Sequence, residues 1–258
     1  MLKIIQRYFL KEKFSSKKLP LVVLGSSSSE IFDYIFGNNP EYFPYWAGGW
    51  SARGLRSQEH EIYLRKIMKD IPKNANILLN FGCADVAFTL RHMAANKGVY
   101  DFPKILREAA EGIEKCRRVL IGMGFKRVYA VFVSPMISLP QEYWNRLQPG
   151  RQLPDRMLGV IYYDLFKLVS KRMPTINFFD ELSRTEDGSY LLKDKYKREK
   201  PDHHPDYIKI QRIVYDKLKI ISGMMPIRDT LLAEKYPTYP APIKDLLASG
   251  TTRPRTCR

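Results

Sequence analysis

Short apolar runs alternate along this chain with longer segments in which apolar residues recur at helical spacing. The apolar runs occupy residues 21–24, 77–81, 128–133 and 176–179. Each run is followed directly by Gly, Ser or Asp. An apolar run that ends in turn-forming residues is typical of a buried strand.

The segments between these runs are predicted to be helices. They occupy residues 30–36, 61–68, 85–95, 102–123, 155–172 and 206–221. Ser57 is a suitable N-cap for the second helix, and Gly124 follows the fourth as its expected C′ residue. Residues 38–54 are rich in Gly, Pro and aromatic side chains, so we expect them to be irregular or to contain one weak strand.

Alternating apolar strands and helices indicate a parallel sheet that is covered by helices on both faces. We therefore predict an α/β protein, a three-layer α/β/α sandwich of the flavodoxin-like kind with a central parallel sheet. In such sheets ligands bind beyond the carboxyl ends of the strands. The loops after Leu24, Phe81, Val133 and Phe179 should therefore carry the chemistry.

The two ends of the chain differ from this pattern. Residues 1–19 interleave apolar and basic side chains and are predicted to form a basic amphipathic segment, and residues 20–222 form the α/β domain. The first segment could lie on an anionic membrane surface, or it could pack on the domain with its lysines in solvent. Residues 223–258 are rich in proline and are expected to pack on the domain or to be partly disordered.

The charge of the chain points to an anionic partner. In its 258 residues, Lys and Arg number 43 and Asp and Glu 27, which gives a net charge of +16. Acidic glycans, phospholipid headgroups and nucleic acids all fit that sign. No recognised nucleic-acid motif accompanies the charge, so we do not expect nucleic acid as the partner. The oligomeric state is left open.

Cysteine usage and hydropathy bear on localisation. Cys83, Cys116 and Cys257 have no CxxC spacing, so neither a disulfide framework nor a zinc site is expected. Residues 1–10 lack the continuous apolar stretch of a secretory signal, and no run reaches the roughly 18 apolar residues of a membrane span. We expect a cytoplasmic protein, and the amphipathic segment leaves a peripheral membrane association open.

A serine cluster, residues 26–29, follows the first predicted strand and precedes the first predicted helix. A serine at such a turn projects its hydroxyl at the sheet edge, where backbone N–H groups at the helix start can bind a developing oxyanion. The same serines could simply cap the helix in a flexible turn.

Two of the four histidines, His203 and His204, precede the last predicted helix in the sequence Pro-Asp-His-His-Pro-Asp. A histidine here could reach the serine turn and act as a base, with an adjacent carboxylate fixing its tautomer. Asp202 or Asp206 could instead only cap the helix. A metal is not expected, because four neighbouring loop residues seldom converge on one ion. His60, flanked by two glutamates, is expected to be exposed.

These residues resemble the SGNH or GDSL-type hydrolases. Residues 21–27, Leu-Val-Val-Leu-Gly-Ser-Ser, are similar to the first family block, an apolar strand followed by Gly-Asp-Ser, which makes Ser27 the candidate nucleophile. The second family block contributes a glycine whose N–H helps to bind the oxyanion, and Gly49 corresponds to it.

The other two blocks follow in the family's order. Residues 82–85, Gly-Cys-Ala-Asp, resemble the third block, Gly-x-Asn-Asp, and residues 201–204, Pro-Asp-His-His, resemble the fourth, Asp-x-x-His. Three positions depart from the pattern. Ser26 stands in place of Asp, Ala84 in place of the Asn that donates to the oxyanion, and Asp202 lies two rather than three residues before His204.

The resemblance implies acyl-ester chemistry without a cofactor. Ser27 would attack the acyl carbonyl, His204 would take its proton, and Asp202 would orient His204. The other implied oxyanion or substrate-binding residues are Gly49, Asp85, Ser26, Arg91 and His203. Asp85 would bind substrate hydroxyls, while Arg91 would bind an acidic substrate group or simply pair with a surface acid.

The expected substrate is an acylated small molecule or glycan in cell-surface polysaccharide metabolism. Water as acceptor would make the protein an esterase, and a sugar hydroxyl would make it an O-acyltransferase. The alternative is a catalytically weak or inactive module of the same fold that holds an anionic glycan, membrane surface or nucleic acid through its charge.

Overall fold

The computed structural model describes residues 18–37, 39–98, 101–147 and 153–227. Within these residues, parallel strands form one sheet in the order β2-β1-β3-β4-β5. The strands are β1 (Leu21–Gly25), β2 (Tyr42–Trp46), β3 (Asn76–Asn80), β4 (Arg127–Phe132) and β5 (Thr175–Asn177). This topology confirms the predicted parallel sheet, and it brings the carboxyl ends of all the strands to one edge.

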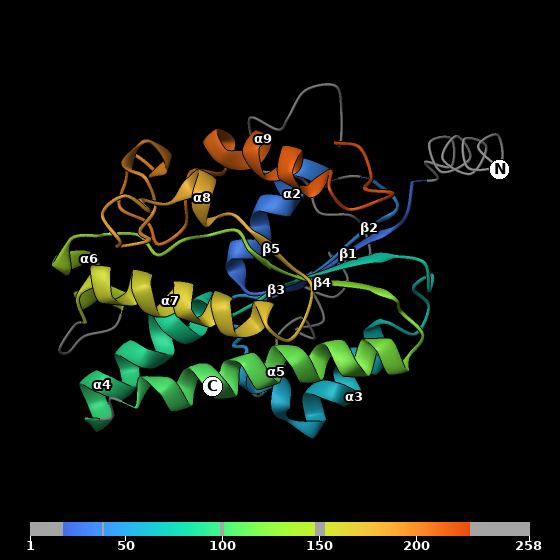
Figure 1. The fold of residues 1–258 in the computed structure, drawn as a ribbon, viewed down its shortest axis with the longest axis horizontal. Helices are drawn as coiled ribbons and strands as arrows, with labels where there is room; N and C mark the ends of the chain where they lie inside the picture. Colours follow the sequence, from blue (N-terminus) through green and yellow to red (C-terminus); the bar gives the residue numbers. More distant parts are fainter. Residues whose placement is uncertain (1–17, 38, 99–100, 148–152, 228–258) are drawn as a thin grey trace, which may run out of the picture.

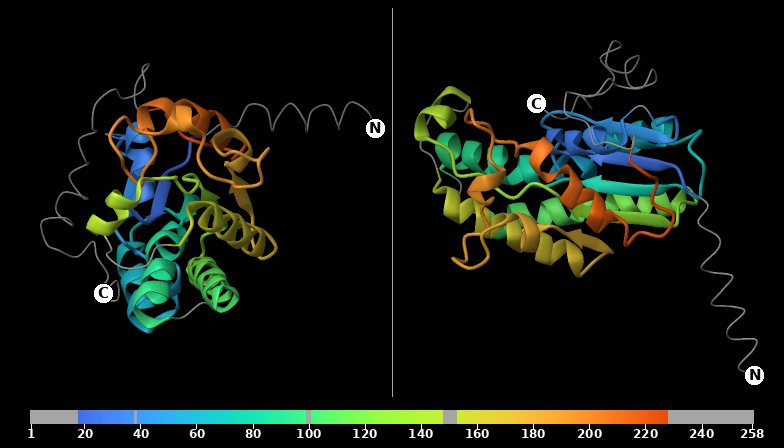
Figure 2. Two further views of the ribbon diagram at one scale, coloured as in Figure 1. Left: turned by 90° about the vertical axis from the view of Figure 1, so that its left-hand side faces the viewer. Right: turned by 90° about the horizontal axis from the view of Figure 1, so that it is seen from above.

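Helices cover both faces of the sheet (Figure 1). The α-helices are α2 (Ile31–Phe36), α3 (Gln58–Ile67), α4 (Arg91–Lys97), α5 (Phe102–Gly122), α6 (Gln141–Leu147), α7 (Asp155–Ser170), α8 (Phe179–Leu182) and α9 (Tyr207–Leu218). The shorter helical turns are η1 (Ser27–Glu30), η2 (Arg53–Arg56), η3 (Asp85–Leu90) and η4 (Asp194–Tyr196). In Figures 1 and 2, α2, α8 and α9 lie on one face of the sheet, and α3, α5 and α7 lie on the other. The predicted three-layer α/β/α sandwich is confirmed.

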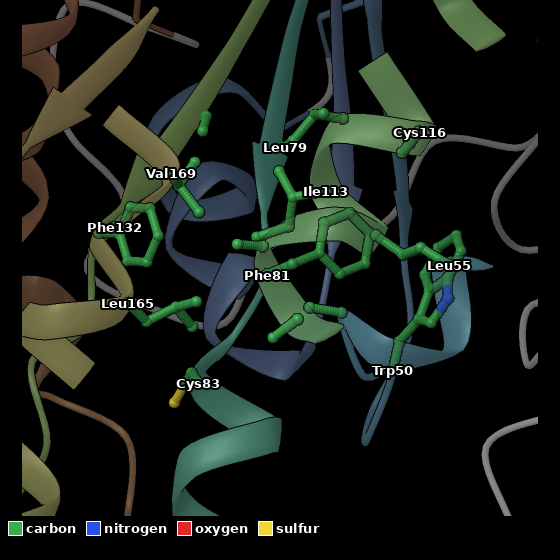
Figure 3. Close-up of a cluster of buried hydrophobic side chains, with 14 of the residues drawn as sticks. Trp50, Leu55, Leu79, Phe81, Cys83, Ile113, Cys116, Phe132, Leu165 and Val169 are labelled. Atoms are coloured by element: carbon green, nitrogen blue, oxygen red, sulfur yellow. The ribbon is translucent and has the colours of Figure 1, made fainter. Parts of the chain in front are cut away.

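Alternate side chains of each strand supply two separate cores. In β1, Val22 and Leu24 pack in the larger cluster with α3, α5 and α7, while Leu21 and Val23 pack in the smaller cluster with α2 and α9. This alternation follows from the period of two residues in a strand. Figure 3 shows part of the larger cluster, where Trp50, Phe81 and Phe132 gather around residues of α5 and α7.

Several local expectations are confirmed and others need correction. Ser57 caps α3 by accepting a hydrogen bond from the His60 N–H, and Gly124 follows α5 with a φ of +95°. Residues 38–54 contain the edge strand β2, and the predicted helix 85–95 is divided into η3 and α4. The predicted strand at 176–179 instead ends at Asn177, because Phe179 already begins α8.

The expected exposure of His60 was wrong. Its side chain is buried against Trp50, with ring centroids 5.1 Å apart, because α3 turns this residue toward the core rather than toward solvent. The flanking glutamates misled the prediction, since neighbours in a helix point in different directions.

The ends of the predicted domain can be described only in part. Residues 1–17 and 228–258, which hold nearly all of the predicted amphipathic segment and most of the proline-rich tail, lie outside the described residues. Leu19 N–H donates to the Gly223 carbonyl at 3.0 Å, and Met225 is buried in the smaller core. In the part of the chain that the structure describes, no helix has the length and hydropathy to cross a membrane.

Candidate active site

The turn after β1 isolates one serine from the other three in the cluster. Ser28 and Ser29 are buried, and their hydroxyls accept hydrogen bonds from Asn80 Nδ2 at 3.1 and 3.0 Å. Ser26 is also buried, with its hydroxyl 3.2 Å from that of Ser28. Ser27 alone in the cluster is partly exposed. Three serines thus fix the turn, and the fourth is presented at the sheet edge.

The tightness of this turn requires a glycine before it. A Cβ at Gly25 would lie 2.2 Å from Ser29 Oγ and 2.4 Å from the Asn80 carbonyl oxygen. No side chain fits there, because real Cβ atoms do not approach other atoms so closely. Gly25 therefore lets β1 run against β3 and places Ser27 at the end of the strand.

Ser27 meets a histidine from the other end of the domain. His204 Nε2 lies 2.8 Å from Ser27 Oγ, and His204 Nδ1 lies 3.0 Å from Asp202 Oδ1. The backbone N–H of His204 also donates to Asp202 Oδ1 at 2.8 Å. With Nδ1 protonated toward Asp202, Nε2 is free to accept the Ser27 proton. Serine, histidine and carboxylate therefore have the relative geometry of a Ser-His-Asp triad, with the acid two residues before the histidine.

Asp202 is held as an anion by its surroundings. Burial alone would raise its pKa, but hydrogen bonds from the His204 ring and backbone, together with the His204 and Arg198 charges, lower the pKa to about 2. Arg198 Nη1 donates to Asp202 Oδ2 at 3.0 Å, and Arg198 Nε donates to the Pro205 carbonyl at 3.1 Å. Arg198 also stacks over the ring of Tyr207 at 5.0 Å. Through these three contacts, Arg198 stabilises the conformation of the loop that carries His204.

Two backbone N–H groups, those of Ser27 and Gly49, belong to turns that follow the neighbouring strands β1 and β2. Ser27 begins η1, so its N–H has no helical acceptor, and Gly49 lies in a turn closed by Trp50 N–H donating to the Ala47 carbonyl. Gly49 has a φ of +73°, which glycine adopts without strain. Ala47 N–H donates to the Gly25 carbonyl at 3.0 Å, so this turn leaves the sheet beside the serine turn.

Asp85 has a different role from the one expected for it. It is fully buried, and its two oxygens accept the N–H groups of Ala52 at 2.6 Å and Arg53 at 3.1 Å. Burial raises the pKa of Asp85 to about 6, and these hydrogen bonds oppose the rise. Because its oxygens are occupied inside the protein, Asp85 does not reach substrate hydroxyls. It ties the loop that carries Gly49 to the start of η3.

His203 has a separate environment from its neighbour His204. Its Nδ1 lies 2.5 Å from Tyr143 Oη, and its backbone N–H donates to the same oxygen at 3.1 Å. The ring packs edge-on against Phe88, with centroids 5.1 Å apart at 85°. Burial and the charge of His204 lower the pKa of His203 to about 4, so its imidazole is neutral at pH 7.

Arg91 is also committed within the protein. Its Nη2 donates to Asp155 Oδ1 at 2.6 Å, its Nη1 donates to the Leu153 carbonyl at 3.2 Å, and its guanidinium lies over the ring of Trp144. The expected ion pair with an acid is therefore found, but in the interior, where Arg91 is only 1% exposed. Its charge is neutralised by Asp155 rather than offered to an acidic substrate.

A small apolar pocket lies beside His203. Its walls include Cys83, Trp144, Leu158 and part of Arg91, and its volume is about 10 Å³. That volume accommodates about one water molecule. Among the described residues, ligand atoms of Asp202, His203 and His204 lie within 4.8 Å of one another. Each of these three side chains already has a hydrogen-bond partner within the protein. Such hydrogen-bonded chains of side chains are suited to proton transfer.

Sequence reasoning missed three residues that shape the site. Asn80 anchors the serine turn, Arg198 holds Asp202, and Tyr143 holds His203. Asn80 could have been noticed as the one polar residue within the otherwise apolar predicted strand 77–81. Arg198 lies in the basic stretch of residues 193–200, whose charges alone do not indicate a contact with Asp202. Nothing in the sequence links Tyr143 to the histidine loop.

Comparisons with known proteins support the fold. No protein-family model matches the sequence, and no curated protein matches it significantly. Among solved structures, one reported as a candidate platelet activating factor from Streptococcus pneumonia is 16% identical, with a TM-score of 0.50 over 84% of this chain and 90% of that one. A carbohydrate acetylesterase from Sinorhizobium meliloti is 12% identical, with a TM-score of 0.46 over 79% of this chain and 99% of that one. At such identities the likeness extends to the fold alone, and the match with a TM-score of 0.50 agrees with the predicted three-layer α/β/α sandwich.

Proposed function

We propose that this chain is an SGNH-type ester hydrolase or O-acyltransferase in which Ser27 is the nucleophile, His204 the general base and Asp202 the residue that orients the base. The observation that carries the proposal is the continuous hydrogen-bonded row from Ser27 Oγ through both nitrogens of His204 to Asp202. Hydrogen-bonded serines are common in proteins. A partly exposed serine on a partly buried histidine–carboxylate pair, at the ligand edge of a parallel sheet, favours catalysis.

In the acylation step, Ser27 Oγ attacks the acyl carbonyl while His204 Nε2 accepts the hydroxyl proton. The resulting oxyanion accepts hydrogen bonds from the N–H groups of Ser27 and Gly49. When the intermediate collapses, the bond to the leaving oxygen breaks and His204 returns its proton to that oxygen. The alcohol departs, and the acyl group remains on Ser27 as an ester.

In the second step, His204 removes a proton from the acceptor, which attacks the acyl-serine carbonyl. The bond to Ser27 Oγ breaks, and His204 returns the proton to it. Water as acceptor releases a carboxylic acid, and a sugar hydroxyl yields a new ester. Asp202 stays ionised throughout and stabilises the imidazolium that forms in each step.

We further propose an acylated carbohydrate in cell-surface polysaccharide metabolism as the substrate. The net charge of +16 favours a substrate carried on an acidic glycan. This charge supports the substrate class, and the chemistry of Ser27 does not depend on it.

The proposal is tested by labelling the serine and by measuring turnover. A fluorophosphonate probe should label the wild-type protein, and an acetyl ester should be hydrolysed. Ser27→Ala should abolish both signals, with a melting temperature near that of wild type. Ser170→Ala, which alters a surface serine of α7, is the matched control and should change neither. Wild-type labelling that survives in the Ser27→Ala variant would remove Ser27 from its role.

A binding module without catalysis is the second candidate, and the net charge of +16 is the observation that favours it. It predicts no labelling by the probe, together with binding to an acidic polysaccharide that weakens steeply as salt is raised. Measuring both properties on the same preparation separates the two candidates.

A further inference from the structure

The missing third oxyanion donor leaves a gap in the proposed site. In the proteins that this chain resembles, an asparagine donates to the oxyanion from the position of Ala84, and alanine has no donor to offer. Losing one such donor typically costs about 100-fold or more in rate. A chain that retains the serine, the base and the acid would gain from another donor close to this position.

His203 lies next to the place where that asparagine would be. Cys83, directly before Ala84, lines the same pocket as His203. Phe88, four residues after Ala84 and one helical turn away, packs edge-on against the His203 ring. The rings of His203 and His204 are 4.0 Å apart, so the pocket and the proposed base are neighbours.

Tyr143 determines which ring nitrogen of His203 carries the proton. The Tyr143 oxygen accepts the His203 backbone N–H, and its own proton is available to the nearest acceptor, His203 Nδ1 at 2.5 Å. Nδ1 is then an acceptor, so the neutral ring carries its proton on Nε2. Within the described part of the chain, Nε2 of His203 has no hydrogen-bond partner.

We propose that His203, held by Tyr143 as the Nε2–H tautomer, is the substrate-binding donor that takes the place of the asparagine missing at Ala84. This inference rests on the proposed function, and it assigns to His203 the binding of the developing oxyanion or of the ester oxygen beside it. Because burial keeps the imidazole neutral at pH 7, the ring donates without adding a second charge next to His204.

The first test is kinetic and compares donors at one position. His203→Phe fills the space without a donor and should lower kcat about 100-fold, with KM little changed. His203→Gln places an amide N–H near the former Nε2 and should keep kcat within about tenfold of wild type. His203→Asn, whose amide reaches only the Nδ1 position, should behave like His203→Phe. His92→Phe alters an exposed histidine of α4 and is the matched control.

A second variant restores the family's arrangement. In a His203→Ala background, adding Ala84→Asn should recover at least tenfold in kcat, while the same Asn in the wild-type protein should add little. Such non-additivity is expected when two side chains serve one role. If the double variant folds but recovers nothing, the two positions do not share a role and the inference fails.

The third test does not depend on turnover. Nitrogen-15 NMR of the four histidines, assigned by single variants, should show His203 protonated on Nε2 at pH 7, with the proton moving or exchanging in Tyr143→Phe. A proton on Nδ1 in the wild type, or an unchanged kcat in His203→Phe, would overturn the inference while leaving Ser27 labelling intact. Failure of the proposed function is seen separately, as absence of Ser27 labelling.

Discussion

Ser27 and His204 are separated by 177 residues in the sequence, yet Ser27 Oγ lies 2.8 Å from His204 Nε2. Ser27 lies two residues after the end of β1 and begins η1, which leads into α2, and His204 lies three residues before the start of α9. The two helices pack on the same face of the sheet, where the rings of Tyr34 and Tyr207 lie 5.4 Å apart. The packing of α2 against α9 therefore sets the distance between the proposed nucleophile and base.

Replacing Asp202 tests the orienting carboxylate. In Asp202→Asn, the amide can present a donor to His204 Nδ1 and so favour the wrong tautomer, and kcat should fall by about 10³- to 10⁴-fold. KM and the melting temperature should change little. Asp206→Asn is the matched control, because Asp206 caps α9 and asparagine caps a helix equally well. Equal losses in both variants would mean that the loop, and not the Asp202 carboxylate, is responsible.

Asp85 provides a test of the loop that carries Gly49. In Asp85→Asn, one acceptor oxygen becomes an NH₂ group that faces a backbone N–H, so either the Ala52 or the Arg53 bond is lost. We expect kcat to fall by about 10- to 100-fold, because the Gly49 donor would be displaced, and complete loss of one oxyanion donor costs about 100-fold or more. The amide protons of Ala52 and Arg53 should also exchange faster with solvent. Asp101→Asn, at the N-cap of α5, should leave kcat and exchange unchanged.

His60 should make the protein less stable in acid. Burial lowers the pKa of His60 to about 4 from 6.5, so below pH 6.5 the unfolded chain binds a proton that the folded one does not. The free energy of unfolding therefore falls as the pH drops from about 6.5 toward 4. Neither ring nitrogen has a hydrogen-bond partner among the described residues.

His60→Phe should remove this dependence and keep the packing on Trp50. Its melting temperature should exceed that of wild type by a margin that grows as the pH is lowered from 7 to 5. His92→Phe, at an exposed position, should show no such trend. A margin that stays constant over this range would mean that His60 is not buried in its neutral form.

Asp33 should change the pH dependence of stability in the direction opposite to that of His60. Its carboxylate accepts hydrogen bonds from Tyr42 Oη at 2.6 Å and Trp46 Nε1 at 2.9 Å, which ties the edge strand β2 to α2. Burial raises its pKa from 3.8 to about 8 despite these two bonds. Between these values the folded chain keeps a proton that the unfolded chain has released, so this group's contribution to stability is lost as the pH rises from about 4 to 8.

Asp33→Asn should therefore gain stability relative to wild type as the pH is raised from 5 to 8, because its amide has no proton to lose. Thermal unfolding at each pH measures the difference in melting temperature. Asp164→Asn, which alters an exposed acid on α7, should give a difference that does not vary with pH. A decreasing difference for Asp33→Asn would contradict the raised pKa.

Much of the fold could be predicted because strand and helix patterns are local. Four of the strands, the long helices and the cap at Ser57 follow from short stretches of sequence whose periodicity and end residues are sufficient evidence. The edge strand β2 was harder to predict, since a proline divides its aromatic residues and no aliphatic run marks it as a strand. The positions of Ser27, Gly49 and His204 at one edge also follow, because parallel strands end on the same side.

What the sequence could not supply is the partner of each side chain. Asp85 and Arg91 were identified as polar residues near the ligand edge, but burial and pairing depend on which backbone and which acid pack against them in three dimensions. The same holds for His60, whose glutamate neighbours suggested solvent. Periodicity along the chain thus determined the layers and the strand edge, and short motifs that resemble those of a known family indicated the candidate serine and histidine. Both kinds of signal depend on neighbours in sequence. The tertiary packing alone decided which polar groups face each other, because hydrogen bonds and desolvation act between residues that are distant in the chain and close in space.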